Sequence, residues 1–266
     1  MQTKKFQYNK STISYRFGGT GHPVLFLHGF AEDSRIWDTT IEHLKNDYQL
    51  IVPDLPGSGA SSLLEANTVS INDYADVIHA ILQEERIDKC TLIGHSMGGY
   101  ISLAFAKKYP RKIEALGLFH SSAYADDEEK KETRRKAINV IKEKGPKAFL
   151  KTAIPGLFAD AAKNQEDVDT LLQQGNAFTA DALIQYYEAM ISRPDTTEVL
   201  KTTQQPVLFI MGEHDKAVPF EHSLQQSHLP AISHIKILRN SAHMGMLEEK
   251  AAILETLADF LQAVYV

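Results

Sequence analysis

The fold of this chain is decided by the stretch Leu92-Ile93-Gly94-His95-Ser96-Met97-Gly98-Gly99-Tyr100. Gly94 and Gly98 stand two residues before and after Ser96, a spacing typical of a nucleophile elbow. Such a turn lifts the serine hydroxyl clear of the backbone, strains the serine, and brings neighbouring backbone so close that glycine is needed. The alternative interpretation is an ordinary strand-to-helix turn in which Ser96 caps the helix.

The residues on either side favour the elbow. Residues 90–93 form a short apolar run that predicts a buried strand, and residues 97–109 predict a helix that stops before Pro110. The start of that helix supplies free N–H groups and the positive end of a dipole beneath Ser96.

Strands and helices alternate through the first 120 residues. An antiparallel hairpin is expected over residues 6–17, followed by strands at 23–27, 48–53 and 113–119 with helices between them. Further strands are predicted at 206–211 and 234–238, and a final amphipathic helix is predicted over 247–264. This order predicts an α/β fold, a mostly parallel twisted sheet of about eight strands with helices on both faces.

A helical block interrupts the alternation. From Ser121 to about Thr203 the patterns predict helices and no strand, with a charged helix over 126–144 that Gly145-Pro146 should end. We therefore expect a core domain made of residues 1–120 and 204–266, with a helical cap at 121–203.

Composition excludes several classes of function. The 266 residues carry a net charge of −6, which argues against binding nucleic acid through its phosphates. Cys90 is the single cysteine, so no internal disulfide can form, as suits a reducing compartment. The first residues lack the apolar run of a secretion signal, and no run of 18 apolar residues could span a membrane. We expect a cytoplasmic protein.

A serine nucleophile needs a base to take its proton and an acid to orient that base. Ligand sites of parallel sheets collect beyond the carboxyl ends of the strands. Asp215 follows the 206–211 strand and His243 follows the 234–238 strand, and the order Ser, Asp, His is the one expected for this elbow. Ser96, Asp215 and His243 are thus the predicted nucleophile, acid and base. The oxyanion of the reaction needs two donors, for which we assign the backbone N–H groups of Phe30 and Met97.

Other residues compete for these roles. Glu213 is a rival acid, and Asp54 is a nucleophile only in principle, because it precedes the elbow and suits its own turn-rich loop. His28 could be a metal ligand, but no second histidine stands at ligand spacing, so we assign it a structural role and predict no metal site. The remaining histidines near these strands are less well placed than His243; they are His120, His214, His222, His228 and His234.

Over nearly its full length the chain resembles the α/β-hydrolase superfamily. The matching motifs are Leu27-His28-Gly29-Phe30, Trp37-Asp38, Asp54-Leu55-Pro56-Gly57-Ser58-Gly59, Gly94-His95-Ser96-Met97-Gly98-Gly99, Gly212-Glu213-His214-Asp215 and Ala242-His243. The resemblance implies the triad Ser96, Asp215 and His243, a helical cap over the site, and no cofactor.

Departures from related branches narrow the resemblance. Dehalogenases and epoxide hydrolases carry aspartate where this chain has Ser96, and carbon–carbon bond hydrolases usually have asparagine in place of His95. The menaquinone-pathway synthase of this fold has arginine where Tyr100 stands, and the Gly-Gly-Ser-Trp-Gly of proline iminopeptidases is not matched. What remains is similar to small-molecule carboxylesterases and oxoadipate enol-lactonases.

The resemblance implies a serine-dependent hydrolase of small carboxylic esters or lactones that works through an acyl-enzyme. The alternatives are an oxoadipate enol-lactonase-like or carbon–carbon bond hydrolase, and a non-enzymatic small-ligand receptor that retains the triad. A closed cap favours short acyl chains, and because no cap cation stands out as a carboxylate clamp, we expect mainly uncharged substrates. Large apolar side chains of the cap pack within it or face the site; they are Phe149, Ile154, Leu157, Phe158, Phe178, Tyr186, Tyr187 and Met190.

Overall fold

One eight-stranded sheet organises the protein, whose computed structural model describes residues 1–265. The strands lie in the order β1-β2-β4-β3-β5-β6-β7-β8, with β1 and β2 forming an antiparallel hairpin at one edge. β2 also pairs antiparallel with β4, and every other neighbouring pair is parallel. The strands are β1 (Gln2–Tyr8), β2 (Ser11–Gly18), β3 (His22–Leu27), β4 (Tyr48–Pro53), β5 (Cys90–His95), β6 (Ile113–Phe119), β7 (Val207–Gly212) and β8 (Ser233–Leu238). The predicted mostly parallel, eight-stranded sheet is confirmed.

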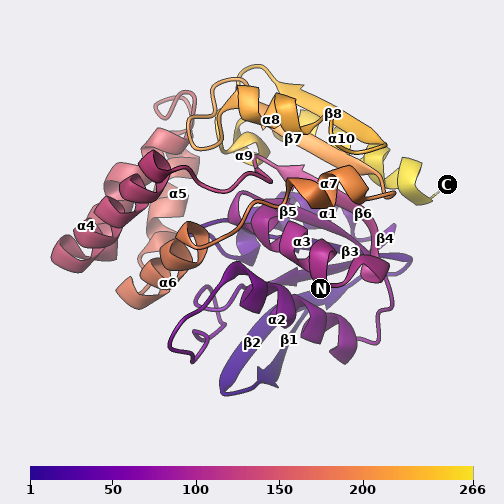
Figure 1. Cartoon of the computed structure of the whole chain (residues 1–266), viewed down its shortest axis with the longest axis horizontal. Coiled ribbons are helices and arrows are strands. Elements are labelled where there is room, and N and C mark those ends of the chain that lie inside the picture. The colour runs from indigo at the N-terminus through magenta and orange to yellow at the C-terminus, as the bar shows by residue number, and fades with distance from the viewer. Residues whose placement is uncertain (266) are drawn as a thin grey trace.

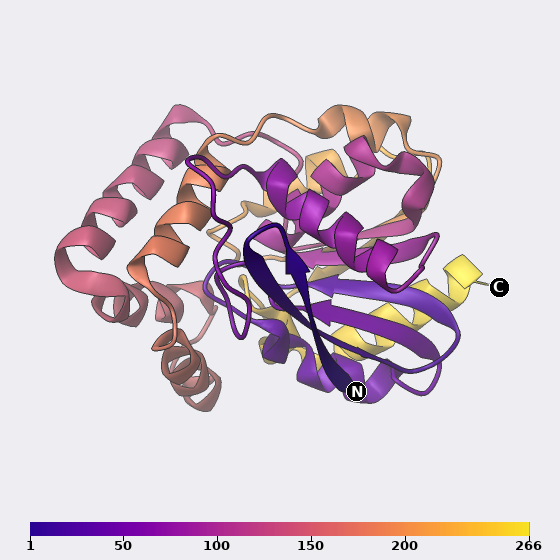
Figure 2. The same ribbon diagram turned by 90° about the horizontal axis from the view of Figure 1, so that it is seen from below.

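Helices cover both faces of this sheet (Figure 2). α2 (Ile71–Glu84) packs beside α3 (Met97–Lys108) on one face, while α1 (Asp38–Leu44) and α10 (Lys250–Tyr265) lie together on the other. Every residue of β5 and β7 is buried, as expected for apolar strands covered on both sides. Their carboxyl ends are therefore held rigidly where the candidate site lies.

The segment between β6 and β7 is helical, and none of its residues forms a strand in the described structure. It holds α4 (Glu128–Ala153), the short 3₁₀ helix η3 (Ile154–Leu157), α5 (Gln165–Gly175), α6 (Ala180–Ile191) and α7 (Thr197–Thr202). Figure 1 shows α4, α5 and α6 grouped to one side of the sheet.

Two predicted helix boundaries were wrong in detail, whereas the predicted end of the charged helix is confirmed. Gly145 has non-helical φ and ψ of 81° and 163°, so α4 consists of two helical segments that meet at this residue. Pro146 opens the second segment, where a missing N–H costs nothing. The first predicted helix is a 3₁₀ turn (Ser34–Trp37) followed by α1, and the closing helix is preceded by α9 (Gly245–Glu248). The remaining short helices are η2 (Pro110–Lys112) and α8 (Phe220–Gln226). Within residues 1–265 no helix combines the length and apolarity needed to cross a bilayer.

Candidate active site

The turn from β5 into α3 holds Ser96 in a conformation that few side chains adopt, with φ of +51° and ψ of −114°. A Cβ atom on Gly94 would lie 2.2 Å from the carbonyl carbon of Gly98, and one on Gly98 would lie 2.5 Å from the oxygen of Leu27. Both glycines are required because backbone fills the space that a side chain would need. The strain at Ser96 distinguishes this turn from an ordinary helix cap, and no side-chain capping bond from Ser96 to α3 is present.

The structure brings the three predicted residues into one hydrogen-bonded line. His243 Nε2 lies 2.9 Å from Ser96 Oγ, and His243 Nδ1 lies 2.8 Å from Asp215 Oδ2. Asp215 follows β7 and His243 follows β8, so adjacent strand ends supply the acid and the base. This arrangement allows a proton to pass from the serine hydroxyl to the imidazole while the carboxylate fixes the ring.

Asp215 is buried and heavily hydrogen-bonded. Its Oδ1 accepts the backbone N–H groups of Ala217 and Val218 at 2.8 and 2.9 Å. Burial alone would raise the pKa of Asp215, but the charge and hydrogen bonds of His243 and His120 outweigh it and hold this pKa well below its usual range. The carboxylate is therefore ionised whenever the site could work. The rival Glu213 is exposed, and its carboxylate bonds to no described residue.

His120 is a partner that the sequence argument set aside, because it precedes every acid candidate. It ends β6 with φ of +48°, its Nδ1 lies 3.3 Å from Asp215 Oδ2, and its Nε2 accepts the N–H of Gly245. Burial lowers the pKa of His120 to about 4, so the ring is neutral at pH 7. Its place at the carboxyl end of the strand beside β7 was the one sequence feature that could have identified it.

His120, Asp215 and His243 together offer atoms within 4.8 Å of one another, the composition of a metal site. The 2.8 Å contact between His243 Nδ1 and Asp215 Oδ2, however, is a direct hydrogen bond with no room for an ion between the two atoms. The donor set thus suits proton transfer better than metal ligation.

We expect the buried neutral state of His120 to make the fold sensitive to acid. Between pH 6.5 and about 4 the unfolded chain binds a proton on this ring that the folded chain excludes. The free energy of unfolding should therefore fall by up to about 3 kcal/mol as the pH drops through this window. Urea unfolding at several pH values should show a shallower fall for His120→Asn, because asparagine tolerates positive φ and does not titrate. Identical slopes in the two proteins would contradict this assignment.

A second buried pair lies behind the triad and was missed by the sequence analysis. Glu32 Oε2 accepts the N–H of Gly29 at 2.7 Å and lies 3.0 Å from His95 Nδ1. His95 Nε2 in turn lies 3.0 Å from the carbonyl oxygen of His243. Burial would raise the pKa of Glu32 and lower that of His95, but their mutual charge and hydrogen bond reverse both shifts. This chain of contacts joins the loop after β3, the elbow and the loop after β8.

The loop after β3 also approaches Ser96 closely. A Cβ atom on Gly29 would lie 3.2 Å from Ser96 Cβ, so this loop borders the serine. Neither the Phe30 N–H nor the Met97 N–H donates to an acceptor within residues 1–265. The two predicted oxyanion donors are therefore both unengaged and close to the elbow.

His28 and Asp54 occupy structural positions. His28 Nε2 accepts the N–H of Leu55 at 2.9 Å and contacts Ser58 Oγ at 2.8 Å, which fastens the loop after β3 to the loop after β4. Asp54 accepts the N–H of Ala60 in its own loop and the N–H of Ser34 at the start of the 3₁₀ turn, so it ties down its loop and joins it to that turn. Both contacts agree with the roles expected from the sequence.

A cavity of about 670 Å³ opens over Ser96 and His243. Three of the eight apolar side chains singled out between β6 and β7 line it, namely Leu157, Tyr187 and Met190. The ring of Tyr187 stacks on Phe30 at 4.3 Å between centroids, so α6 lies directly over the loop after β3. Three cations of the same block also line the cavity, although none of them stood out as a carboxylate clamp in the sequence; they are Lys130, Arg134 and Arg193.

The chain is similar to known proteins in both sequence and structure. The family profile described as the alpha/beta hydrolase fold matches residues 22–137. One curated relative is a 2-(acetamidomethylene)succinate hydrolase of Mesorhizobium japonicum, which is 24% identical over 98% of this chain and 95% of that protein. A second is the dihydrolipoyllysine-residue acetyltransferase component of the acetoin cleaving system of Cupriavidus necator, which is 26% identical over 88% of this chain. The chain spans 62% of the length of the second relative. A solved thermophilic esterase of Thermogutta terrifontis is 26% identical, with both chains fully covered and a TM-score of 0.93.

Proposed function

Because the chain belongs to the α/β-hydrolase superfamily, we propose that it is a serine hydrolase that cleaves small carboxylic esters or lactones through an acyl-enzyme. One observation carries the proposal: the continuous hydrogen-bonded line from Ser96 through His243 to Asp215. The similarity to an esterase over both full chains agrees with it.

The proposed reaction has two halves. Ser96 Oγ bonds to the carbonyl carbon of the substrate while His243 Nε2 takes its proton, and the N–H groups of Phe30 and Met97 stabilise the oxyanion. The imidazolium then gives that proton to the leaving oxygen as the ester C–O bond breaks. Water releases the acyl group from Ser96 by the same steps in reverse, and Asp215 keeps the ring oriented throughout.

We also propose that residues 121–203 act as a cap over a core of residues 1–120 and 204–266. Two contacts support this division into a cap and a core. The carbonyl oxygen of Leu157 in η3 accepts the backbone N–H of His243 at 2.9 Å, and Tyr187 of α6 stacks on Phe30. Residues 121–203 thus cover His243 and the loop after β3 that contains Phe30. This cover limits the space for substrate.

A panel of nitrophenyl esters from acetate to palmitate, assayed beside a few lactones, tests the proposed function. We expect many turnovers per protein and a kcat/KM that is highest for short acyl chains, because α4 and α6 wall the cavity. A preference for the longest chains would contradict the closed cap. No turnover together with tight saturable binding of a small ligand would favour a receptor instead.

A further inference from the structure

Arg134 places a largely buried cation on the wall of the cavity that contains Ser96. Its side chain is 13% exposed, and its Nε donates to Asp126 Oδ2 at 2.6 Å. The two terminal nitrogens of the guanidinium meet no acceptor among the described residues. A buried guanidinium that keeps unengaged donors toward a cavity is suited to an anionic ligand.

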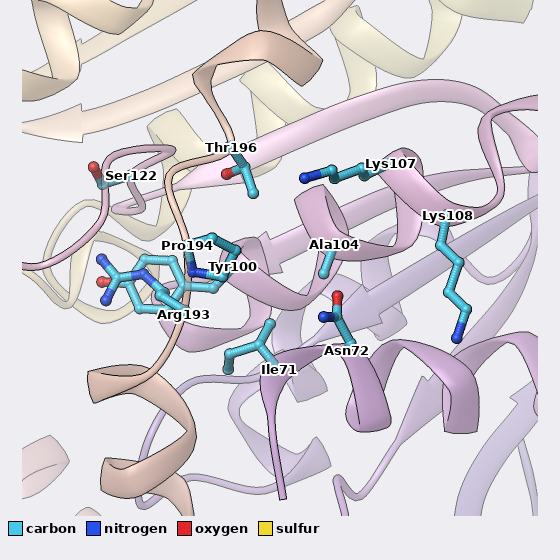
Figure 3. A pocket seen from close by; sticks show the side chains of 10 residues that line it. All are labelled: Ile71, Asn72, Tyr100, Ala104, Lys107, Lys108, Ser122, Arg193, Pro194 and Thr196. Carbon is cyan, nitrogen blue, oxygen red and sulfur yellow. The ribbon is translucent and has the colours of Figure 1, made fainter.

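Arg193 beside it has partners at both terminal nitrogens and therefore has a different role. Its Nη1 contacts Asp126 Oδ1 at 2.8 Å and donates to the carbonyl oxygen of Met190, while Nη2 donates to that of Tyr124. The Arg193 guanidinium carbon lies 3.9 Å from the centroid of the Tyr100 ring. Both side chains line a second cavity of about 280 Å³ (Figure 3). Arg193 therefore fixes Asp126, and Asp126 in turn orients Arg134.

The charges on this wall do not cancel. Two guanidinium groups share the single carboxylate of Asp126, and Lys130 adds a third cation whose Nζ donates to the carbonyl oxygen of Ala217. Burial would raise the pKa of Tyr100, but Arg193, Lys130 and Arg134 outweigh it and lower this pKa, as expected for a positive potential.

The other acidic side chains that line the cavity do not neutralise this wall. Asp127 and Glu129 border the cavity from exposed positions, where water screens their charge. Asp127 also accepts the N–H of Lys130 at the start of α4, and Glu32 is paired with His95. The excess positive charge thus remains at Arg134.

Building on the proposed hydrolase function, we propose that Arg134 binds a carboxylate of the substrate, and that the preferred substrates are small esters or lactones carrying a free carboxylate away from the bond that is cleaved. The planar guanidinium can bind a carboxylate through two parallel hydrogen bonds, which are strong where water is excluded. A neutral analogue of the same shape would leave the terminal nitrogens unpaired and should be rejected for that reason.

The test compares two esters of nearly equal shape, monoethyl succinate and ethyl 4-methylpentanoate, which replaces the carboxylate with an isopropyl group. The wild-type protein should prefer the charged ester in kcat/KM. Arg134→Gln should lower the ratio of charged to neutral kcat/KM by ~10–100-fold, mainly through KM for the half-ester. Arg134→Lys should retain part of the ratio because it keeps the charge.

Arg135→Gln is the matched control, because Arg135 is the next residue of α4, has a side chain 49% exposed and does not line the cavity. It should leave the ratio unchanged. An equal loss on both esters in Arg134→Gln would overturn the proposal and make Arg134 a purely structural anchor for Asp126. Circular dichroism and the melting temperature of the same samples show whether each variant folds. If Arg134→Gln does not fold, the comparison of the two esters is made with Arg134→Lys instead.

Binding of succinate separates the failure of this proposal from the failure of the hydrolase function. Calorimetry with Ser96→Ala should show succinate binding that the added Arg134→Gln substitution weakens. If the wild type hydrolyses the neutral ester at least as fast as the half-ester, the carboxylate site is refuted and the hydrolase function stands. If no ester is hydrolysed but succinate binds through Arg134, the carboxylate site stands and the hydrolase function falls.

Discussion

Ser96→Ala is expected to lower kcat for a short-chain nitrophenyl ester by about 10⁴-fold or more. The substitution removes the Oγ that lies 2.9 Å from His243 Nε2, and with it the only atom in the line that could form the acyl intermediate. Any remaining rate would come from binding and from the N–H groups of Phe30 and Met97. The measurement is steady-state hydrolysis at equal protein concentration, combined with the melting temperature.

The fold should tolerate this change, because the Ser96 side chain gives no capping bond to α3. Ser192→Ala is a suitable control, since Ser192 lies just after α6 and its hydroxyl bonds only to backbone carbonyls there. It should retain the wild-type rate. Near-normal hydrolysis by Ser96→Ala would remove Ser96 from the proposed mechanism.

Asp215→Asn is expected to reduce kcat by about 10⁴-fold, comparable to the loss seen when a triad acid becomes an amide. The carboxylate accepts from His243 Nδ1 and so keeps Nε2 free to take the serine proton. An amide can present its N–H₂ group to the ring instead, which favours the wrong tautomer, and it no longer stabilises the imidazolium.

Glu213→Gln provides the matched comparison two residues away on the same loop. Its exposed carboxylate contacts none of the described catalytic candidates, so its rate should stay within about twofold of the wild type. Activity retained in Asp215→Asn and lost in Glu213→Gln would transfer the role of acid to Glu213.

Much of the fold could be predicted from the sequence because local pattern and tertiary structure agree in the core. The apolar runs that became β5 and β7 are buried at every residue, which is what an uninterrupted apolar run of strand length indicates. The Ser70-x-x-Asp73 pattern before an apolar run is typical of a capping box, and in the structure Asp73 Oδ2 accepts the Ser70 N–H at 2.8 Å. The positions of Ser96, Asp215 and His243 were predictable because each follows a strand of one parallel sheet.

The contacts that could not be predicted from the sequence are those between residues of different loops. Glu32 and His95 are separated by 63 positions and meet only because β3 and β5 are neighbours in the sheet. Arg134 lies in the first half of α4 and Arg193 follows α6, yet both reach Asp126. Neither set of contacts is marked by a local sequence motif. The charge around the cavity could therefore be assessed only from the three-dimensional arrangement.

The pair of Glu32 and His95 has a consequence for anyone who would redesign this protein. The pair fastens three loops through Gly29, His95 and the carbonyl oxygen of His243, and both side chains are buried. Removing one member leaves the other without its counter-ion in the interior, which is far more disruptive than replacing both with a well-packed neutral pair. Variant libraries should therefore treat these two positions as one unit.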